Sequence, residues 1–326
     1  MINEIIVNLD PFLLQILKSI IAFLLAVTFV LVNAIIFIYL ERKLWARIMQ
    51  RMGPVYVGKW GILQLIADFI KMLAKEIIIP AKANKIAFLA MPILVTTLSL
   101  ALVIIVPFDY IVAYTLYTFS PFIPQFEIFE KMIVSNSFSS GLILIFAILG
   151  FNPVFILLTG WISNNKYTVL GGFRAAAQLL SFEIPLLITV ASILILAGTF
   201  NLYEIVEKQQ KIWFILVAPL AFVLFLLTAL AEAERTPFDI PDAESEIVTG
   251  WNTEYSAVPF MLLILGMYIR AIVSAALIAI FFFGGWYGPE LPGFLKPLSG
   301  PLWFSLKIYA FILLFIIIRG AFPRYR

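Results

Sequence analysis

The sequence contains no cysteine and no histidine among its 326 residues. Without cysteine, the chain cannot form disulfide bonds, iron–sulfur clusters or thiolate zinc sites of its own. Without histidine, it lacks the commonest metal ligand and the side chain that most often moves protons near neutral pH. Proton chemistry must therefore fall to carboxylates, lysine, tyrosine, arginine or water, and nothing in the chain carries electrons.

Charged residues are also scarce. They make up 13% of the chain against 63% for hydrophobic residues, and the mean hydropathy is +1.06. Soluble domains usually carry nearly twice that share of charge, and about 20 apolar residues suffice to cross a bilayer as a helix. We therefore expect an all-α, polytopic helix bundle in the cell membrane, with residues 1–326 as one transmembrane domain. The seven expected spans are about 13–40, 86–106, 138–161, 176–197, 212–231, 258–283 and 302–320.

Basic residues are distributed unevenly between the connections. If the segment after the first span is cytoplasmic, that side carries 15 lysines and arginines and the opposite side carries four. Lysine and arginine accumulate in cytoplasmic loops. The bias predicts an N-terminus outside and a C-terminus in the cytoplasm, with the connections 41–85 and 232–257 both cytoplasmic.

The connection after the first span begins with a basic stretch. Its cations are Arg42, Lys43, Arg47 and Arg51, and GPVYVG then interrupts the chain. Residues 61–76 have apolar positions at helical spacing, with Asp68 and Lys71 on the polar side, so they predict an amphipathic helix too short to span. An interfacial anchor with ordinary positive-inside charge explains this pattern as simply as a functional site does.

Residues 229–255, ALAEAERTPFDIPDAESEIVTGWNTEY, form an acidic segment between two apolar runs. Its single base is Arg235, and its acids are Glu232, Glu234, Asp239, Asp242, Glu244, Glu246 and Glu254. Placing a carboxylate in or beside a membrane costs free energy, so such residues indicate a functional site unless another role is shown. A solvated loop that docks on a basic partner is an equal alternative for this acidic loop, 232–257.

Two further carboxylates are expected near the cytoplasmic side, like the acidic loop. Glu41 closes the first span, and Glu183 lies early in the fourth, about two helical turns after Arg174. Several carboxylates at one side of a bundle could relay protons through water. They could equally form structural ion pairs with Arg42, Lys43 and Arg235, and the sequence leaves both interpretations open.

The sequence lacks the motifs of several other classes of protein. The sequence has no phosphate-binding glycine loop, no nucleophile elbow and no inverted repeat, so we expect neither a nucleotide-binding fold nor a free-standing transporter. Nucleic acid is not an expected partner, and GGWYGPELPG (284–293) is typical of a turn with interfacial aromatics.

Six segments occur in the order found in one known family. They are ERKLWARIMQRMGPVYVG, GILQLIADFIKMLAKE, FRAAAQLLSFEIP, AEAERTPFDIPDAESEIVTGWNTEYS, FFGGWYGP and RGAFPRYR. From about residue 10 onward the sequence resembles the H-type membrane subunit of respiratory complex I, also called NADH dehydrogenase subunit 1. That family includes related subunits of membrane-bound nickel–iron hydrogenases and sulfur-reducing complexes.

The resemblance implies a non-redox subunit that joins the peripheral electron-transfer arm to the ion-pumping membrane arm and helps form a quinone chamber. The residues it implies for the chamber or interface are Glu41, Arg42, Lys43, Ala46, Arg47, Arg51, Asp68, Lys71, Arg235 and Asp239. The residues it implies for proton or ion coupling are Glu183, Glu232, Glu234, Glu244, Glu246 and Glu254. It implies no catalytic residue and no metal in this chain, with iron–sulfur clusters held by peripheral partner subunits.

Two departures from the family pattern favour an alternative. Quinone-reducing members continue beyond the PRYR motif into an eighth span, whereas this sequence stops at Arg326, and the connection 107–137 is longer than expected. The alternative is the equivalent anchor and coupling subunit of a hydrogenase or sulfur-reducing complex, with no quinone bound and nickel–iron in a partner.

Overall fold

The computed structural model describes residues 11–119, 135, 138–241, 243–289, 292, 296 and 298–325, and these residues form helices and connecting turns without a β-strand. Six of the helices are long and apolar enough to cross a membrane. They are α2 (Pro11–Ile48), α4 (Lys85–Ile105), α7 (Gly141–Ile162), α8 (Lys166–Ala197), α13 (Ala257–Phe282) and α14 (Ser299–Ala321). The expected all-α, polytopic membrane bundle is confirmed.

Shorter helices complete the described part of the chain. They are η1 (Lys59–Gly61), α3 (Gln64–Ala74), α5 (Phe108–Phe119), α9 (Leu202–Lys208), α10 (Phe214–Val217), α11 (Pro219–Glu232), α12 (Glu244–Ile247) and η3 (Gly250–Asn252). The amphipathic segment of 61–76 contains α3, and the connection expected at 107–137 begins with α5. The remaining part of that connection lies almost entirely outside the described residues.

The fifth apolar run forms two helices, α10 and α11, that meet at Ala218. The backbone of Ala218 leaves the helical region (φ −131°, ψ 62°), and Pro219 then begins α11. Proline suits the first helical position because its missing N–H would have no partner there. With 14 residues, α11 is about 21 Å long, which is shorter than the roughly 30 Å of a hydrocarbon core. The chain therefore leaves α11 while still inside the bundle.

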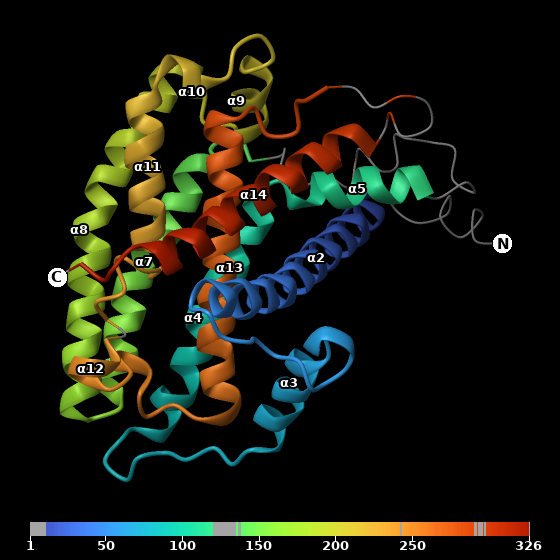
Figure 1. The fold of residues 1–326 in the computed structure, drawn as a ribbon. Helices are drawn as coiled ribbons and strands as arrows, with labels where there is room; N and C mark the ends of the chain where they lie inside the picture. The colour runs from blue at the N-terminus through green and yellow to red at the C-terminus, as the bar shows by residue number, and fades with distance from the viewer. Residues whose placement is uncertain are drawn as a thin grey trace.

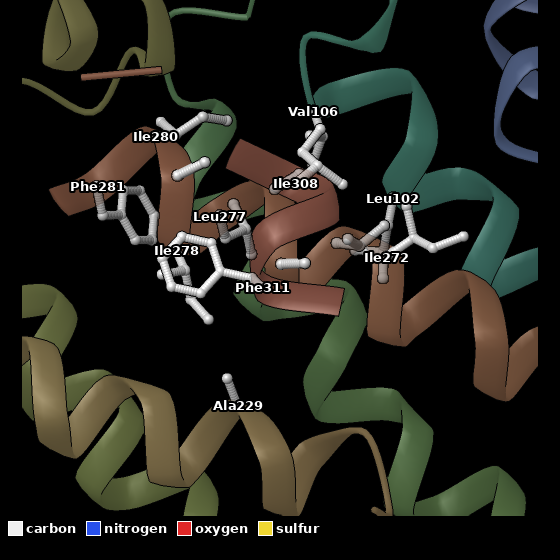
Figure 2. Close-up of a cluster of buried hydrophobic side chains, with 14 of the residues drawn as sticks. Leu102, Val106, Ala229, Ile272, Leu277, Ile278, Ile280, Phe281, Ile308 and Phe311 are labelled. Atoms are coloured by element: carbon white, nitrogen blue, oxygen red, sulfur yellow. The ribbon is translucent and has the colours of Figure 1, made fainter. Parts of the chain in front are cut away.

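The helix α13 is the centre of the bundle. Its apolar window is 78% buried, whereas the windows of the other five candidate spans are 28–44% buried. In Figure 1, α13 stands upright beside α4 and α11, and α2, α5 and α14 cross the bundle obliquely. Figure 2 shows part of the resulting core, where α13 side chains such as Ile272 and Phe281 meet Leu102 of α4 and Phe311 of α14.

The oblique path of α2 agrees with its length. Its apolar part, Phe23–Ile48, has 26 residues, which corresponds to about 39 Å of helix. A core about 30 Å thick holds such a segment only if the helix tilts by roughly 40° or extends past the core. The C-terminal end of α2 thus carries Arg42, Lys43 and Arg47 and reaches α3.

Small residues bring α7, α8 and the acidic loop into close contact. A Cβ atom on Gly160 would lie 2.4 Å from the Thr168 carbonyl oxygen, and one on Gly171 would lie 2.5 Å from the Trp251 nitrogen. Membrane helices use such residues to let backbones approach. The second contact presses η3 against α8 and fixes the end of the acidic loop.

Buried polar side chains hold the opposite end of the bundle together. The Lys307 ammonium donates to the carbonyl oxygens of Phe283, Gly285 and Tyr287, each at 2.7 Å. Gln209 donates to the Ile280 carbonyl at 2.7 Å and accepts from the Gly284 N–H at 3.0 Å. The turn within GGWYGPELPG is thus tied to α14 and α9 through its backbone.

Candidate functional site: a buried charge network under the acidic loop

The acidic loop starts inside the protein because of how α11 ends. The Arg235 N–H bonds to the Leu230 carbonyl at 3.1 Å and the Glu234 N–H to the Ala231 carbonyl at 3.1 Å, with Glu234 at φ 51°. These are the two bonds of a Schellman cap, whose left-handed position is usually glycine. A non-glycine residue there costs on the order of 1 kcal/mol. This cap directs the adjacent side chains of Glu234 and Arg235, both buried, toward different neighbours.

The first neighbour of the cap is an ion cluster on α2 and α14. Glu41 Oε1 accepts from Arg235 Nη1 at 2.7 Å and also from Arg319 Nη1. The side chains of Arg235 and Glu41 are only 8% and 4% exposed. The Arg235 guanidinium also lies 4.3 Å from the centre of the Tyr268 ring, a favourable cation–π distance. This cluster joins α2, the acidic loop, α13 and α14.

The second neighbour of the cap is Arg270 on α13. Arg270 Nη2 lies 3.6 Å from Glu234 Oε1, and both side chains are 2% exposed. Arg270 Nη1 donates to Asn152 Oδ1 of α7 at 3.0 Å. Burial raises the pKa of Glu234, while the positive charge of Arg270 acts in the opposite direction. Glu232 is buried beside this group and lies within electrostatic reach of Arg270, Glu234 and Glu183.

Glu183 connects this second group to the outside of the bundle. It lines an otherwise apolar groove of about 380 Å³ between α7 and α8, together with residues such as Leu142, Phe146, Leu187 and Phe200. Its side chain is only partly buried. A partly exposed carboxylate on an apolar helix face requires a partner, water or a proton.

The middle of the acidic loop packs against the chain end after α14. Asp239 Oδ2 accepts from Arg324 Nη2 at 2.9 Å, and the Tyr325 N–H donates to the Pro237 carbonyl at 3.0 Å. Burial raises the pKa of Asp239, although the hydrogen bond and charge of Arg324 act to lower it. Gln178 of α8 donates to the Phe238 carbonyl at 2.6 Å, which fastens the same stretch from the other side.

The outer carboxylates of the loop have separate polar partners. Glu246 pairs with Arg174 at 2.8 Å, with both side chains at least one-third exposed. Glu254 accepts from the Asn165 side chain at the start of α8. Asp242 and the Glu244 side chain lie outside the described residues. Of the carboxylates expected to couple, the structure therefore buries Glu232 and Glu234, leaves Glu183 partly buried beside them, and places Glu246 and Glu254 toward the rim.

The residues expected around the chamber lie at the junction of α2 and α3. Arg42 pairs with Asp68, and Lys43 donates to the carbonyls of Pro54 and Trp60 at 2.8 and 3.1 Å. Burial acts to raise the pKa of Asp68, but hydrogen bonds from Arg42 and Gln64 outweigh it, so the pKa falls below its usual value.

The remaining residues expected around the chamber differ in how exposed their side chains are. Ala46 is buried, whereas Arg47, Arg51 and Lys71 are exposed. Apolar side chains around them are also exposed, and they include Met52, Trp60, Ile66, Phe69, Ile70 and Leu73. These residues form an exposed apolar surface edged by charged side chains. The described residues contain no group of three acids that could hold a metal ion.

Several site residues carry no distinctive sequence signal. Asn152 and Arg319 lie far along the chain from their partners Arg270 and Glu41, and Arg270 stands alone within an apolar run. The one available signal was the position of Arg270 inside an expected span, because a charge there usually has a buried partner. The sequence did not identify that partner, which is Glu234.

Comparison with known proteins gives one consistent assignment. The NADH dehydrogenase family profile matches residues 20–326. The H subunit of NADH-quinone oxidoreductase from Rhodospirillum centenum is 39% identical over 297 residues, which cover 91% of this chain and 82% of that protein. Its counterpart in Bacillus cytotoxicus is 40% identical over 287 residues, covering 88% and 79%, and that of Paramagnetospirillum magneticum is 36% identical over 318 residues, covering 98% and 87%. The chain therefore belongs to the NADH dehydrogenase family of membrane proteins, which contains the H subunits of NADH-quinone oxidoreductases.

Proposed function

We propose that this chain couples electron transfer in a peripheral arm to ion translocation in a membrane arm of a complex I-like oxidoreductase. The observation that carries the proposal is the adjacent pair Glu234 and Arg235. Arg235 belongs to the ion cluster with Glu41 on α2, and Glu234 faces Arg270 in the centre of the bundle. A change of charge or position at one cluster acts on the other through a single peptide unit, over a distance at which buried charges interact strongly.

The chamber side of this proposal is the α2–α3 junction with its exposed apolar residues. The peripheral redox subunits would cover this surface, and quinone, when bound, would supply the electron acceptor there. The residues of this chain would exclude water and present the charged groups of Arg42, Asp68 and Arg235 around the acceptor. We assign this side to the cytoplasm, with the N-terminus outside and the C-terminus inside, because basic residues accumulate on it.

The membrane side of the proposal leads from Glu234 through Glu232 to Glu183. Glu183 opens into the apolar groove between α7 and α8, which is where an ion-pumping membrane subunit would approach. Crowded carboxylates do not all stay ionised together, so a proton taken up by one member changes the charge of the others. The relay would therefore pass a change in protonation from the loop to the groove.

The test is the ratio of ions moved to electrons transferred by the tagged, purified complex in vesicles, with NADH or reduced viologen as donor. Glu234→Gln should keep electron transfer while lowering the ion-to-electron ratio severalfold. Glu246→Gln is the matched control, because Glu246 is a loop carboxylate in an exposed ion pair. An unchanged ratio for Glu234→Gln would overturn the coupling role.

The acceptor is tested in the same preparation. Quinone reduction that depends on the α2–α3 junction supports the chamber, and Ile66→Trp on the exposed face of α3 is the variant of choice. Ala46 is less suitable because it is buried, and a larger residue there would disturb packing. Stoichiometric nickel with no quinone reduction would instead assign the complex to the hydrogenase alternative.

A further inference from the structure

Arg270 is an unusual residue for its position. It lies thirteen residues after the start of α13, Ala257, and twelve before its end, Phe282, so it occupies half-height of the most buried helix in the bundle. A buried guanidinium cannot shed its proton at any ordinary pH. Its charge must therefore be balanced where it is, and the resemblance to the family assigns this residue no role.

The polar atoms around Arg270 are incompletely paired. Three buried donors, Arg270 Nε and Nη2 and Asn152 Nδ2, have no hydrogen-bond partner among protein groups. Three buried acceptors, both oxygens of Glu234 and Oε1 of Glu232, are equally without one. The Asn152 amide faces Glu232 closely enough to stabilise its charge, but without regular hydrogen-bond geometry.

Bridging water would pair these three donors with these three acceptors. Buried polar groups in proteins are almost always hydrogen-bonded, and buried waters typically make about three bonds to such groups. The separation of 3.6 Å between Arg270 Nη2 and Glu234 Oε1 is too long for a hydrogen bond. A water in contact with both groups would satisfy each of them.

The net charge of Arg270, Glu232 and Glu234 together decides how many of the two carboxylates are ionised. Two ionised carboxylates with one guanidinium would leave one negative charge inside the protein, at a high cost in solvation. One ionised and one protonated carboxylate would leave none. Glu183, Asp239 and Arg235 also face the pair, but Glu183 is partly exposed and Asp239 and Arg235 have partners of their own.

We propose that Arg270 is the internal counter-ion of a proton-exchange site in which Glu232 and Glu234 share one proton through buried water bonded to Asn152. In this role Arg270 is a positioning residue, since it acts through the two carboxylates. The inference rests on the proposed function for its use in coupling, but the charge balance itself does not depend on that function. Because the guanidinium is fixed and the proton is not, the site can change occupancy without moving a helix.

The sign of the pH effect follows from the charges. An opposite charge within a few ångströms lowers the pKa of a carboxyl group by about one to three units. Replacing Arg270 by an uncharged residue would let both carboxylates keep their protons to higher pH. The acidic limb of the pH profile of ion translocation would therefore move to higher pH by roughly one to two units. Arg270→Lys, which keeps the charge, would retain the wild-type profile within about half a unit.

The experiment measures two quantities on the whole complex, for Arg270→Met, Arg270→Lys, Glu234→Gln and the double variant Arg270→Met/Glu234→Gln. One quantity is the pH profile of ion translocation in vesicles, and the other is the rate of thermal dissociation of the complex. Glu234→Gln should accelerate dissociation no more than about tenfold, because Glu232 can give up the shared proton and balance the charge of Arg270. Arg270→Met should accelerate it less at pH 6 than at pH 8, because the carboxylates can take up protons at the lower pH. The double variant should lie within about tenfold of the wild type.

Lys307→Met is the matched control. Lys307 is also a buried cation in a membrane helix, but its partners are three backbone carbonyls. Its removal should accelerate dissociation without shifting the pH profile.

Additive effects of Arg270→Met and Glu234→Gln on dissociation would overturn the inference, and so would an equal pH shift from Lys307→Met. If instead the two variants couple in dissociation while Glu234→Gln leaves the ion-to-electron ratio unchanged, the counter-ion stands and the proposed coupling function fails.

Discussion

Replacing Glu41 by glutamine isolates the energetic role of the ion cluster that joins α2, the acidic loop and α14. The change keeps the shape of the side chain and one hydrogen-bond acceptor, but it removes the charge that Arg235 and Arg319 share. Arg235 then remains buried with an uncharged acceptor and with two ring contacts, to Tyr268 at 4.3 Å and Phe37 at 5.3 Å. We expect the loss to fall mainly on Arg235, because Arg319 is 27% exposed and can regain water.

The size of the effect follows from burial and distance. Breaking a buried ion pair by removing one partner typically costs about 3–5 kcal/mol. A cation–π contact that is retained offsets about 1 kcal/mol, and the glutamine oxygen keeps a weaker hydrogen bond. The net expectation is about 3 kcal/mol, which corresponds to roughly a hundredfold change in an equilibrium or rate constant. The second variant, Glu41→Gln/Arg235→Gln, removes both charges and should recover most of that loss.

The assay is the rate at which the tagged chain dissociates from the membrane-extracted complex on heating, followed on native gels. Asp68→Asn is the matched control, since it breaks a carboxylate–arginine pair in which the Arg42 and Asp68 side chains are 48% and 26% exposed. Such exposed pairs contribute about 0–1 kcal/mol, so its effect should stay within about fivefold. If Glu41→Gln changed the rate no more than Asp68→Asn does, the burial argument would be refuted.

Three further predictions use other parts of the structure. Gly171→Ala should displace η3 and cut assembly of the complex severalfold on a quantitative native gel, since its Cβ would lie 2.5 Å from the Trp251 nitrogen and overpacking costs about 1–3 kcal/mol; a normal yield would contradict this close approach. Lys307→Met should destabilise by at least about 3 kcal/mol, because it leaves three buried carbonyls without a charged donor, and a thermal dissociation rate raised less than tenfold would contradict it. For Asp239 the pKa is raised on folding, so its contribution to stability is full below about pH 4 and is lost as pH rises through the folded pKa. Asp239→Asn should therefore gain stability relative to the wild type as the pH rises above about 4, and a thermal dissociation series showing the opposite trend would exclude this assignment.

The parts of the fold that depend on local pattern could be predicted from the sequence. Long apolar runs made α4, α7, α13 and α14 identifiable, because spanning a bilayer demands length and apolarity that few other structures share. The break at Pro219 was harder to read, since an apolar run split into α10 and α11 has the same composition as one continuous span. The start of the acidic loop inside the protein follows from the cap that ends α11 at Glu234.

The pairing of charges could not be predicted from local pattern. Glu41 and Arg235 are 194 positions apart, and Arg270 and Asn152 are 118 apart. Such contacts depend on how α2, α7 and α13 pack against one another, which is set by shape and small residues such as Gly160 and Gly171. The sequence could show that carboxylates gather near the acidic loop, but it could not separate interior Glu234 from Glu246 near the rim.

The oblique course of α2 and α14 makes the protein sensitive to the thickness of the surrounding lipid. Lipids with longer chains favour more upright helices, and shorter chains favour a greater tilt. Glu41 lies on α2 and Arg319 on α14, so a change in either tilt alters the geometry of the ion cluster that also holds Arg235. Acyl-chain length in the host membrane would thereby tune the same charges that this chain uses at its chamber end.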